Sequence, residues 1–326
     1  MYQAIAAAAA RLVKIAVMIL VIATFNFLLV HAAPGDPAAV IAGQSGASDE
    51  KLIAQIRAEY GLDQPLHAQL TDYLAKVASF DLGYSYRQRQ PVSVLIGERL
   101  PATLLLTVTA FLLALAIGSL LGTLAGMRAG RWTDTVISVL ALLFYAMPVF
   151  WLGLMLVLIF SVQLGWLPAF GFATIGPSLT GLDLVLDVAT HMILPVTTLA
   201  AIYLAIYARL MRASIIEVEH QDYVKTARAK GASRGRIIRH HMLRNALLPV
   251  ITFAGVQAGA LIGGSVVVET VFAWPGLGRL TFDAVMQRDY PVLLGIFLVM
   301  SVLVIAINLL TDLITRMIDP RLARAG

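Results

Sequence analysis

The amino-acid sequence predicts an all-α polytopic membrane protein with six transmembrane helices and a small helical extracytoplasmic cap. Hydrophobic residues make up 59% of the 326 residues and charged residues only 13%, whereas an ordinary soluble domain has about 25% charged residues. Six uncharged stretches approach or exceed the roughly 20 helical residues that cross about 30 Å of hydrocarbon. Basic residues also gather in alternate connecting segments, as in proteins that cross a membrane several times.

The first 32 residues are predicted to form a cytoplasmic amino terminus and the first span, near 12–32. Arg11 and Lys14 precede the apolar run, and Val30-His-Ala-Ala33 follows it. The same pattern is typical of a cleavable signal peptide. The apolar run is longer than a signal peptide requires, and an even number of spans requires this helix. The sequence therefore favours a retained helix.

Residues 33–100 are predicted to form the extracytoplasmic cap. In Pro34-Gly-Asp-Pro37, a rigid turn is expected in which Asp36 bonds its own backbone. One helix is expected to begin at Ser48 and end at Gly61, and a second to begin near Pro65. About 65 residues with two or three helices can form a cap, but not an independent catalytic domain.

Residues 101–326 are predicted to form the membrane core. The run from Thr135 to Leu182 has no charge, but Gly165-Trp-Leu-Pro168 breaks it into one span and an apolar extracytoplasmic loop. Pro148 is expected to kink that span without ending it. The five core spans are predicted near 102–127, 135–163, 190–208, 247–268 and 292–311.

Two glycine series mark helix faces that approach a neighbour closely. Each series repeats every four residues and so forms one stripe along a helix. Helix packing explains both stripes. For the second series, a gate that moves during transport is the alternative. The series are Gly118, Gly122 and Gly126, followed by Gly255, Gly259 and Gly263.

The distribution of charge predicts the orientation of the chain. If both termini are cytoplasmic, the inside segments hold 16 of the 24 Lys and Arg residues and six of the 19 acidic residues. This asymmetry follows the positive-inside rule. The net charge of +5 therefore reports membrane topology, and no nucleic-acid partner is expected.

A polar, basic segment from Arg209 to Ala246 separates two apolar spans and must lie in water at the membrane surface. It is predicted to be a cytoplasmic loop at residues 209–246. Ala227 and Gly231 lie one helical turn apart, which leaves an edge without bulky side chains for another surface to approach. Gly231 follows a basic turn, so it is expected to end a short helix in the left-handed conformation.

No motif in the sequence indicates an enzyme. There is no cysteine, no G-x-x-x-x-G-K-[ST] phosphate loop, no G-x-S-x-G and no H-E-x-x-H. His240 and His241 are adjacent and point about 100° apart on a helix, so they do not form a two-ligand face. We therefore predict no catalytic, cofactor or metal site in this chain. Since the span centres also lack charge for ion coupling, energy for transport must come from other proteins.

Twelve motifs, in order along the chain, give it a family resemblance. The chain resembles the permease subunits of peptide/nickel-type ABC importers, and most of all the first of the two permeases in dipeptide/oligopeptide importers. The general importer coupling motif opens with Glu-Ala-Ala, whereas Lys225 and Thr226 stand at its first two positions here, as in the peptide-type branch. The motifs are Pro34-Gly-Asp-Pro37, Tyr60-Gly-Leu-Asp-Gln-Pro65, Asp81-Leu-Gly-Tyr-Ser85, Arg99-Leu-Pro-Ala-Thr103, Phe150-Trp-Leu-Gly153, Leu164-Gly-Trp-Leu-Pro168, Ile193-Leu-Pro-Val196, Asp222-Tyr-Val-Lys-Thr-Ala-Arg-Ala-Lys-Gly231, Arg239-His-His-Met-Leu-Arg-Asn-Ala-Leu-Leu-Pro249, Glu269-Thr-Val-Phe-Ala-Trp-Pro-Gly-Leu-Gly278, Arg288-Asp-Tyr-Pro291 and Asp319-Pro-Arg321.

The resemblance implies a type I importer permease fold in a bacterial plasma (inner) membrane. It also implies a homologous second permease, two cytoplasmic ATPase subunits that bind ATP and Mg, and an extracytoplasmic solute-binding protein. Di- or oligopeptides are the expected substrates, and the family also carries nickel chelates, glutathione and opines. The alternative is a membrane scaffold or receptor whose inner loop docks a partner that is not an ATPase.

Three groups of residues are the candidate sites. The first is the coupling contact with an ATPase, in which Ala227 and Gly231 are expected to touch the partner. It comprises Asp222, Tyr223, Thr226, Ala227, Arg228, Ala229, Lys230 and Gly231. The possible gate comprises Gly255, Gly259 and Gly263. The rim expected to receive the binding protein comprises Glu59, Asp72, Trp274, Pro275 and Gly276.

Overall fold

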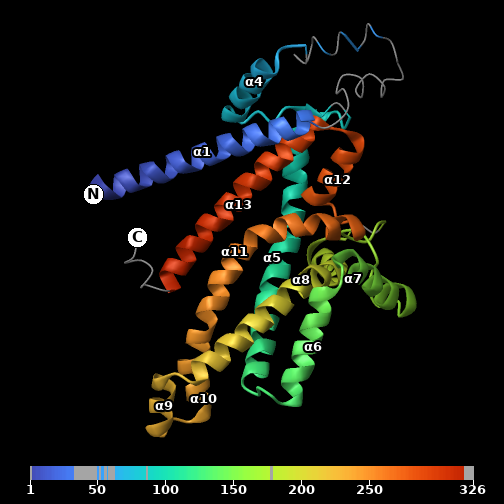
Figure 1. The fold of residues 1–326 in the computed structure, drawn as a ribbon. Coiled ribbons are helices and arrows are strands. Elements are labelled where there is room, and N and C mark those ends of the chain that lie inside the picture. Colours follow the sequence, from blue (N-terminus) through green and yellow to red (C-terminus); the bar gives the residue numbers. More distant parts are fainter. Residues whose placement is uncertain are drawn as a thin grey trace. The chain divides into compact units, whose positions relative to one another are not determined.

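The computed structural model describes residues 2–32, 50, 53–54, 57, 63–85, 87–176 and 179–318 (Figure 1). The chain divides into two compact units. Unit 1 comprises Met1–Pro101 with Arg279–Ile305, and unit 2 comprises Ala102–Gly278 with Ala306–Gly326. The described part of the chain is mostly helical, which confirms the predicted fold class.

Fifteen elements are described, of which two are very short strands. They are, in chain order, α1 (Tyr2–Ala32), α4 (Leu66–Ala78), β1 (Tyr84–Ser85), β2 (Gln90–Pro91), α5 (Val92–Gly126), α6 (Trp132–Ala146), α7 (Val149–Leu156), the π-helix η1 (Val157–Gln163), α8 (Gly181–Glu219), α9 (Asp222–Ala229), α10 (Arg234–Arg236), the π-helix η2 (Ile237–Leu243), α11 (Arg244–Val271), α12 (Leu277–Gln287) and α13 (Tyr290–Ile318).

Apolar helices lie in all six regions where a span was predicted, but they do not all qualify as single spans. Three helices, α5, α8 and α13, are each long and apolar enough to cross a membrane, and two bent helix pairs qualify if each pair counts as one span. The bent pairs are α6 with α7 and η1, and the run from α10 to α11. In α1, the apolar part is shorter, Val13–Leu29.

Unit 1 contains α1 and α4, which pack on each other through an aromatic pair. The rings of Phe27 and Tyr73 stack with centroids 5.6 Å apart, and the Nε2 atom of His31 lies 3.2 Å from Oε1 of Gln69. The predicted helix near Pro65 is confirmed, since α4 begins at the next residue. Most of the predicted turn at 34–37 and helix at 48–61 lies outside the described residues.

A buried polar contact in unit 1 joins the β1 strand to the start of α13. The hydroxyl of Ser85 donates to Oδ2 of Asp289 at 2.5 Å, and both residues are buried. Burial raises the pKa of Asp289, and the Ser85 hydrogen bond opposes that rise. Antiparallel pairing of β1 with β2, in which Tyr84 faces Pro91, fixes the strand that carries Ser85.

In unit 2, the first glycine series brings α5 against α8 (Figure 1). A Cβ atom on Gly118 would lie 2.8 Å from the carbonyl oxygen of Leu204, and one on Gly126 would lie 2.8 Å from Cβ of Ile215. A Cβ atom on Gly122 would meet the Ala208 carbonyl oxygen. The packing role predicted for this series is therefore confirmed.

Pro148 breaks its span, and the prediction that it only kinks the helix is wrong. The α6 helix ends at Ala146, and α7 begins at Val149 at an angle of 107°. A residue before proline is pushed out of the helical region, and Met147 is extended, with φ −75° and ψ 134°. The two segments are thus separate helices rather than one bent helix.

We expect Gly122→Ala to destabilise the protein by about 1–3 kcal/mol, because the added methyl would overlap the α8 backbone, which cannot rotate away. Thermal unfolding of the purified protein in detergent measures this loss. Gly97→Ala is the matched control in the same helix, since nothing lies within 4 Å of its added methyl, and it should be neutral or stabilising by up to about 1 kcal/mol. Equal midpoints for the two variants would contradict the packing argument.

Candidate functional site

The segment between α8 and α11 is a compact helical loop at one end of unit 2 (Figure 1). After α8 ends at Glu219, the chain forms α9, α10 and the π-helix η2 before α11 begins. Asp222 occupies the first turn of α9 and Arg228 the last turn, where each charge complements the helix dipole. The predicted short helix opened by Asp222 and Tyr223 is therefore confirmed.

Gly231 ends α9 in the left-handed conformation that the sequence predicts, with φ +73°. The amide of Gly231 donates to the Arg228 carbonyl at 3.0 Å, and the amide of Ala232 donates to the Ala227 carbonyl at 3.1 Å. This pair of bonds is a Schellman motif, which caps the last carbonyls of a helix. A Cβ atom on Gly231 would have nothing within 4 Å, so the glycine is required for its backbone conformation and lies open to solvent.

Ala227 does not present its side chain to a partner, contrary to the expectation from sequence. It is 8% exposed and packs in the core of unit 2 with Val224, Ile237 and Met242. Val224 and Ala227 are three residues apart, so they form the inner face of α9. The small side chain of Ala227 lets α9 lie close to its own chain. The other predicted coupling residues are exposed, namely Asp222, Tyr223, Thr226, Arg228, Ala229, Lys230 and Gly231.

Two ion pairs fix charged side chains on the exposed side of α9. Lys225 Nζ donates to Oδ1 of Asp222 at 2.9 Å, and this bond lowers the pKa of Asp222. Arg228 donates to Oε1 of Glu219 at 2.7 Å, which ties α9 to the end of α8. Exposed pairs of this kind add little stability, so their main effect is to orient the charges.

A cavity of about 330 Å³ opens beside α9. Its polar wall contains Glu219, Arg228 and Arg234, and Met127 and Met242 contribute apolar surface. Such a hollow can receive a side chain from a docked protein. Among the residues that the structure describes, no cluster of three His, Cys, Asp or Glu side chains is placed to hold a metal.

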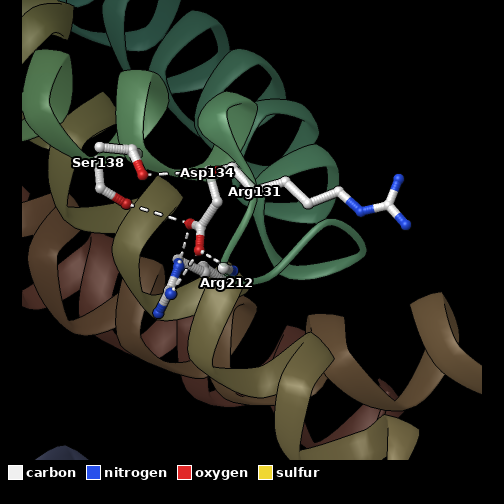
Figure 2. Close-up of polar contacts among 6 residues, drawn as sticks. Arg131, Asp134, Ser138 and Arg212 are labelled. Carbon is white, nitrogen blue, oxygen red and sulfur yellow. Dashed lines mark hydrogen bonds and ion pairs between the residues drawn. The ribbon is translucent and has the colours of Figure 1, made fainter.

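An ion pair that the sequence does not predict, between buried Asp134 and partly exposed Arg212, lies near the start of α6 (Figure 2). Arg212 of α8 donates from Nε to Oδ1 of Asp134 at 2.5 Å and from its terminal amine to Oδ2 at 2.7 Å. The Gly130 amide and the Ser138 hydroxyl also donate to this carboxylate, at 2.9 and 3.3 Å. The two-fold Arg–carboxylate geometry is the strongest form of this contact, and it joins α6 to α8.

The second glycine series is not a uniform stripe. A Cβ atom on Gly255 would overlap the Thr311 side chain of α13, whereas one on Gly263 would have nothing within 4 Å. Between Leu261 and Gly263, the helix bends by 56°. Gly255 is thus a packing residue within unit 2, and Gly263 lies at a bend without a close neighbour.

Two of the residues predicted to form a rim for a binding protein are not at the surface of unit 2. Trp274 is fully buried and donates from its indole nitrogen to the Ala102 carbonyl at 2.9 Å, and Gly276 is also buried. Next to them, Thr103 donates to the buried carboxylate of Glu269 at 2.9 Å. The loop therefore packs into unit 2, where the Trp274 side chain has both an apolar site and an acceptor for its N–H group.

The remaining rim residues differ in exposure. Pro275 is half-buried. Asp72 is exposed and forms an ion pair of 2.7 Å with Lys76 on α4. Glu59 lies outside the described residues.

These features define the class of the protein as a helical membrane protein with an exposed polar loop, residues 209–246, between two apolar helices. The binding-protein-dependent transport system inner membrane component family matches residues 118–324, and its N-terminal counterpart matches residues 5–107. The chain belongs to this family and is a permease subunit of an ABC importer.

Relatives in curated collections match almost the whole chain. A peptide transport system permease protein of Brucella abortus (strain 2308), described as putative, is 43% identical over 304 residues, covering 93% of this chain and 94% of the relative. The glutathione transport system permease protein GsiC of Salmonella choleraesuis (strain SC-B67) is 43% identical over 310 residues, covering 95% and 96%.

Solved structures share the fold at low sequence identity. A chain of an inward-facing methionine ABC transporter has a TM-score of 0.56 and 20% identity, covering 70% of this chain and 97% of its own. A chain of an amino acid ABC transporter has a TM-score of 0.51 and 20% identity, covering 69% and 94%. These likenesses establish a type I importer permease fold, as predicted.

We expect Asp134→Asn to destabilise unit 2 by about 1–3 kcal/mol, because it leaves Arg212 without its charged partner. A double-mutant cycle with Arg212→Gln in thermal unfolding isolates the pair. In the Asp134→Asn background, Arg212→Gln should cost much less than it does in the wild type. Arg131→Gln is the control, since Arg131 is exposed and points away from the pair (Figure 2). Additive losses would show that the ion pair does not couple α6 to α8.

Proposed function

We propose that this chain forms half of a translocation pathway for di- or oligopeptides, driven by ATPase subunits. The names of the Brucella and Salmonella relatives support this substrate class, and glutathione is itself a tripeptide. The proposed assembly contains a homologous second permease, two cytoplasmic ATPases that hold ATP and Mg, and an extracytoplasmic solute-binding protein. Within this chain, no cofactor is required.

The exposed side of α9 is the proposed contact with an ATPase, and it is the observation that carries the proposal. Its polar face is bounded by Gly231, which is open to solvent and has no side chain to keep a partner away. The buried face, Val224 and Ala227, anchors the helix to unit 2. A partner that moves α9 therefore moves the chain behind it.

The proposed orientation places α9 and both termini in the cytoplasm of a bacterial cell. The support is the excess of Lys and Arg in the segments that would then lie inside. In this orientation α4 lies outside, where exposed Asp72 is available to a binding protein. Gly263, at the bend in α11, is the remaining candidate for a gate.

We expect single cysteines at Lys225 and Arg236 to escape a membrane-impermeant thiol reagent in intact cells and to react after the cells are opened. Cysteines at Glu59 and Asp187 should react in intact cells. The native chain has no cysteine, and the Lys225 side chain is 63% exposed, so access to the reagent decides the result. Labelling at position 225 in intact cells would overturn the orientation.

We expect Gly231→Leu and Gly231→Asn to insert normally and to lower uptake about tenfold or more in the reconstituted transporter. A side chain wedged into a packed interface costs about 1–3 kcal/mol. Asn tolerates the left-handed conformation and Leu does not, so the pair separates the partner contact from backbone strain. ATP hydrolysis, uptake and membrane abundance are the measurements.

Gly235→Asn is the matched control for this experiment. Gly235 is exposed in α10, and a Cβ atom there has nothing within 4 Å. Uptake should stay near the wild-type rate in this variant. If Gly231→Asn also transports at the wild-type rate, Gly231 is needed only for the left-handed backbone conformation that ends α9. The proposed ATPase contact at Gly231 is then refuted.

A further inference from the structure

A second cavity, of about 340 Å³, lies between α5, α6 and α8. Its walls are mostly apolar and include Ala141 and Leu142 of α6 and Ala205 of α8. Tyr145 and Arg209 bring polar groups to the same space. Small-ligand sites have this character, an apolar hollow of roughly 300–1,000 Å³ with a few placed polar groups.

Arg209 is the cation in this cavity that remains available to an external anion. Its guanidinium carbon lies 5.3 Å from the centre of the Tyr145 ring, a cation–π distance that holds the planar group in place. No carboxylate among the described residues forms an ion pair with Arg209. Arg212, one turn further along α8, is already occupied by Asp134.

The direction of the Arg209 side chain indicates that the cavity contains water or an anion. Tyr145 lies about three helical turns beyond Asp134 along α6. The Arg209 side chain therefore reaches away from the end of unit 2 that carries α9. A lipid-facing arginine near the end of a span extends toward the nearer membrane surface. In the proposed orientation, Arg209 extends the opposite way, into the depth of the membrane, where a charge requires water or a counter-ion.

We propose that this cavity is a subsite of the translocation pathway that binds the carboxylate of a transported peptide through Arg209. The guanidinium offers two parallel N–H donors to a carboxylate, and the apolar walls accept the adjoining side chain of the peptide. This inference rests on the proposed function and deepens it by assigning a substrate contact to this chain. Tyr145 acts as a positioning residue that keeps the guanidinium over the cavity.

The test uses the full chain in its membrane complex, with one cysteine introduced by Leu142→Cys. Leu142 is 60% exposed and lines the cavity, and this chain has no native cysteine to compete. Its rates of modification by an anionic and by a cationic methanethiosulfonate are compared, with and without Arg209→Gln. Trialanine and trialanine amide are then added as probes, which differ only in the carboxylate. ATP hydrolysis is not needed, so failure of the ATPase coupling does not affect this readout.

We expect the anionic reagent to react about tenfold faster than the cationic one and Arg209→Gln to abolish that preference. Trialanine should slow the reaction and trialanine amide should not. Arg131→Gln should change neither result, and a cysteine at Leu143, exposed beside the cavity, should lack the preference. An unreactive Leu142→Cys would mean that lipid or another subunit covers the cavity, and would overturn the proposal. A preference that survives Arg209→Gln, or equal protection by the amide, would also overturn it, and protection by phosphatidylglycerol vesicles alone would assign the cavity to a lipid headgroup instead.

Discussion

The close approach of α5 to α8 is the constraint on which the rest of unit 2 depends. Glycines at 118, 122 and 126 have no side chain to hold α8 away, so this face of α5 lies against the backbone and Cβ atoms of α8. In a bilayer, apolar side chains gain little by leaving lipid, and this close packing supplies the association that the hydrophobic effect supplies in water. The Asp134–Arg212 pair adds α6 to the same body. These contacts join α6 and the unit 2 part of α5 to α8.

The loop between α8 and α11, the proposed ATPase contact, is positioned by those three helices. The α9 helix has only eight residues, too few to be stable alone in water. Its Schellman cap satisfies the last carbonyls, and burial of Val224 and Ala227 supplies the tertiary packing that so short a helix needs. Arg228 ties it back to Glu219 at the end of α8. The polar face is left exposed because the apolar packing of α9 lies on the opposite side, at Val224 and Ala227.

Much of this fold follows from the sequence because the bilayer restricts what a chain can do. Backbone groups in lipid must be bonded internally, so the long apolar runs form helices, and α5, α8 and α13 are each long enough to span a membrane as predicted. The end of α9 was predictable because Gly231 alone tolerates the conformation required there. Pro148 was misjudged because proline in a span either bends or ends the helix, and which occurs depends on packing that the sequence does not display.

The errors at Ala227 and Trp274 share a different cause. A small or aromatic residue in a polar loop is compatible with a partner surface and equally with burial against its own chain. The spacing of Val224 and Ala227 signals an inner face of α9, and it could have been read from the sequence. The contacts of Trp274 with Ala102 and of Asp134 with Arg212 join segments 172 and 78 residues apart. No local pattern could have revealed them.

One helix carries both of the proposed functional surfaces, and this has a mechanical consequence. The α8 helix runs unbroken over 39 residues, with Arg209 near its last third and α9 attached just beyond its end. Helices that are packed through glycine contacts and an ion pair are expected to move together, because a close-packed interface does not deform continuously. We therefore expect a displacement imposed on α9 to be transmitted along α8 to the cavity at Arg209. Movement of the loop between α8 and α11 would then change the site of an anion bound at Arg209, because both lie on α8. Rigid-body movement of this kind is what alternating access requires.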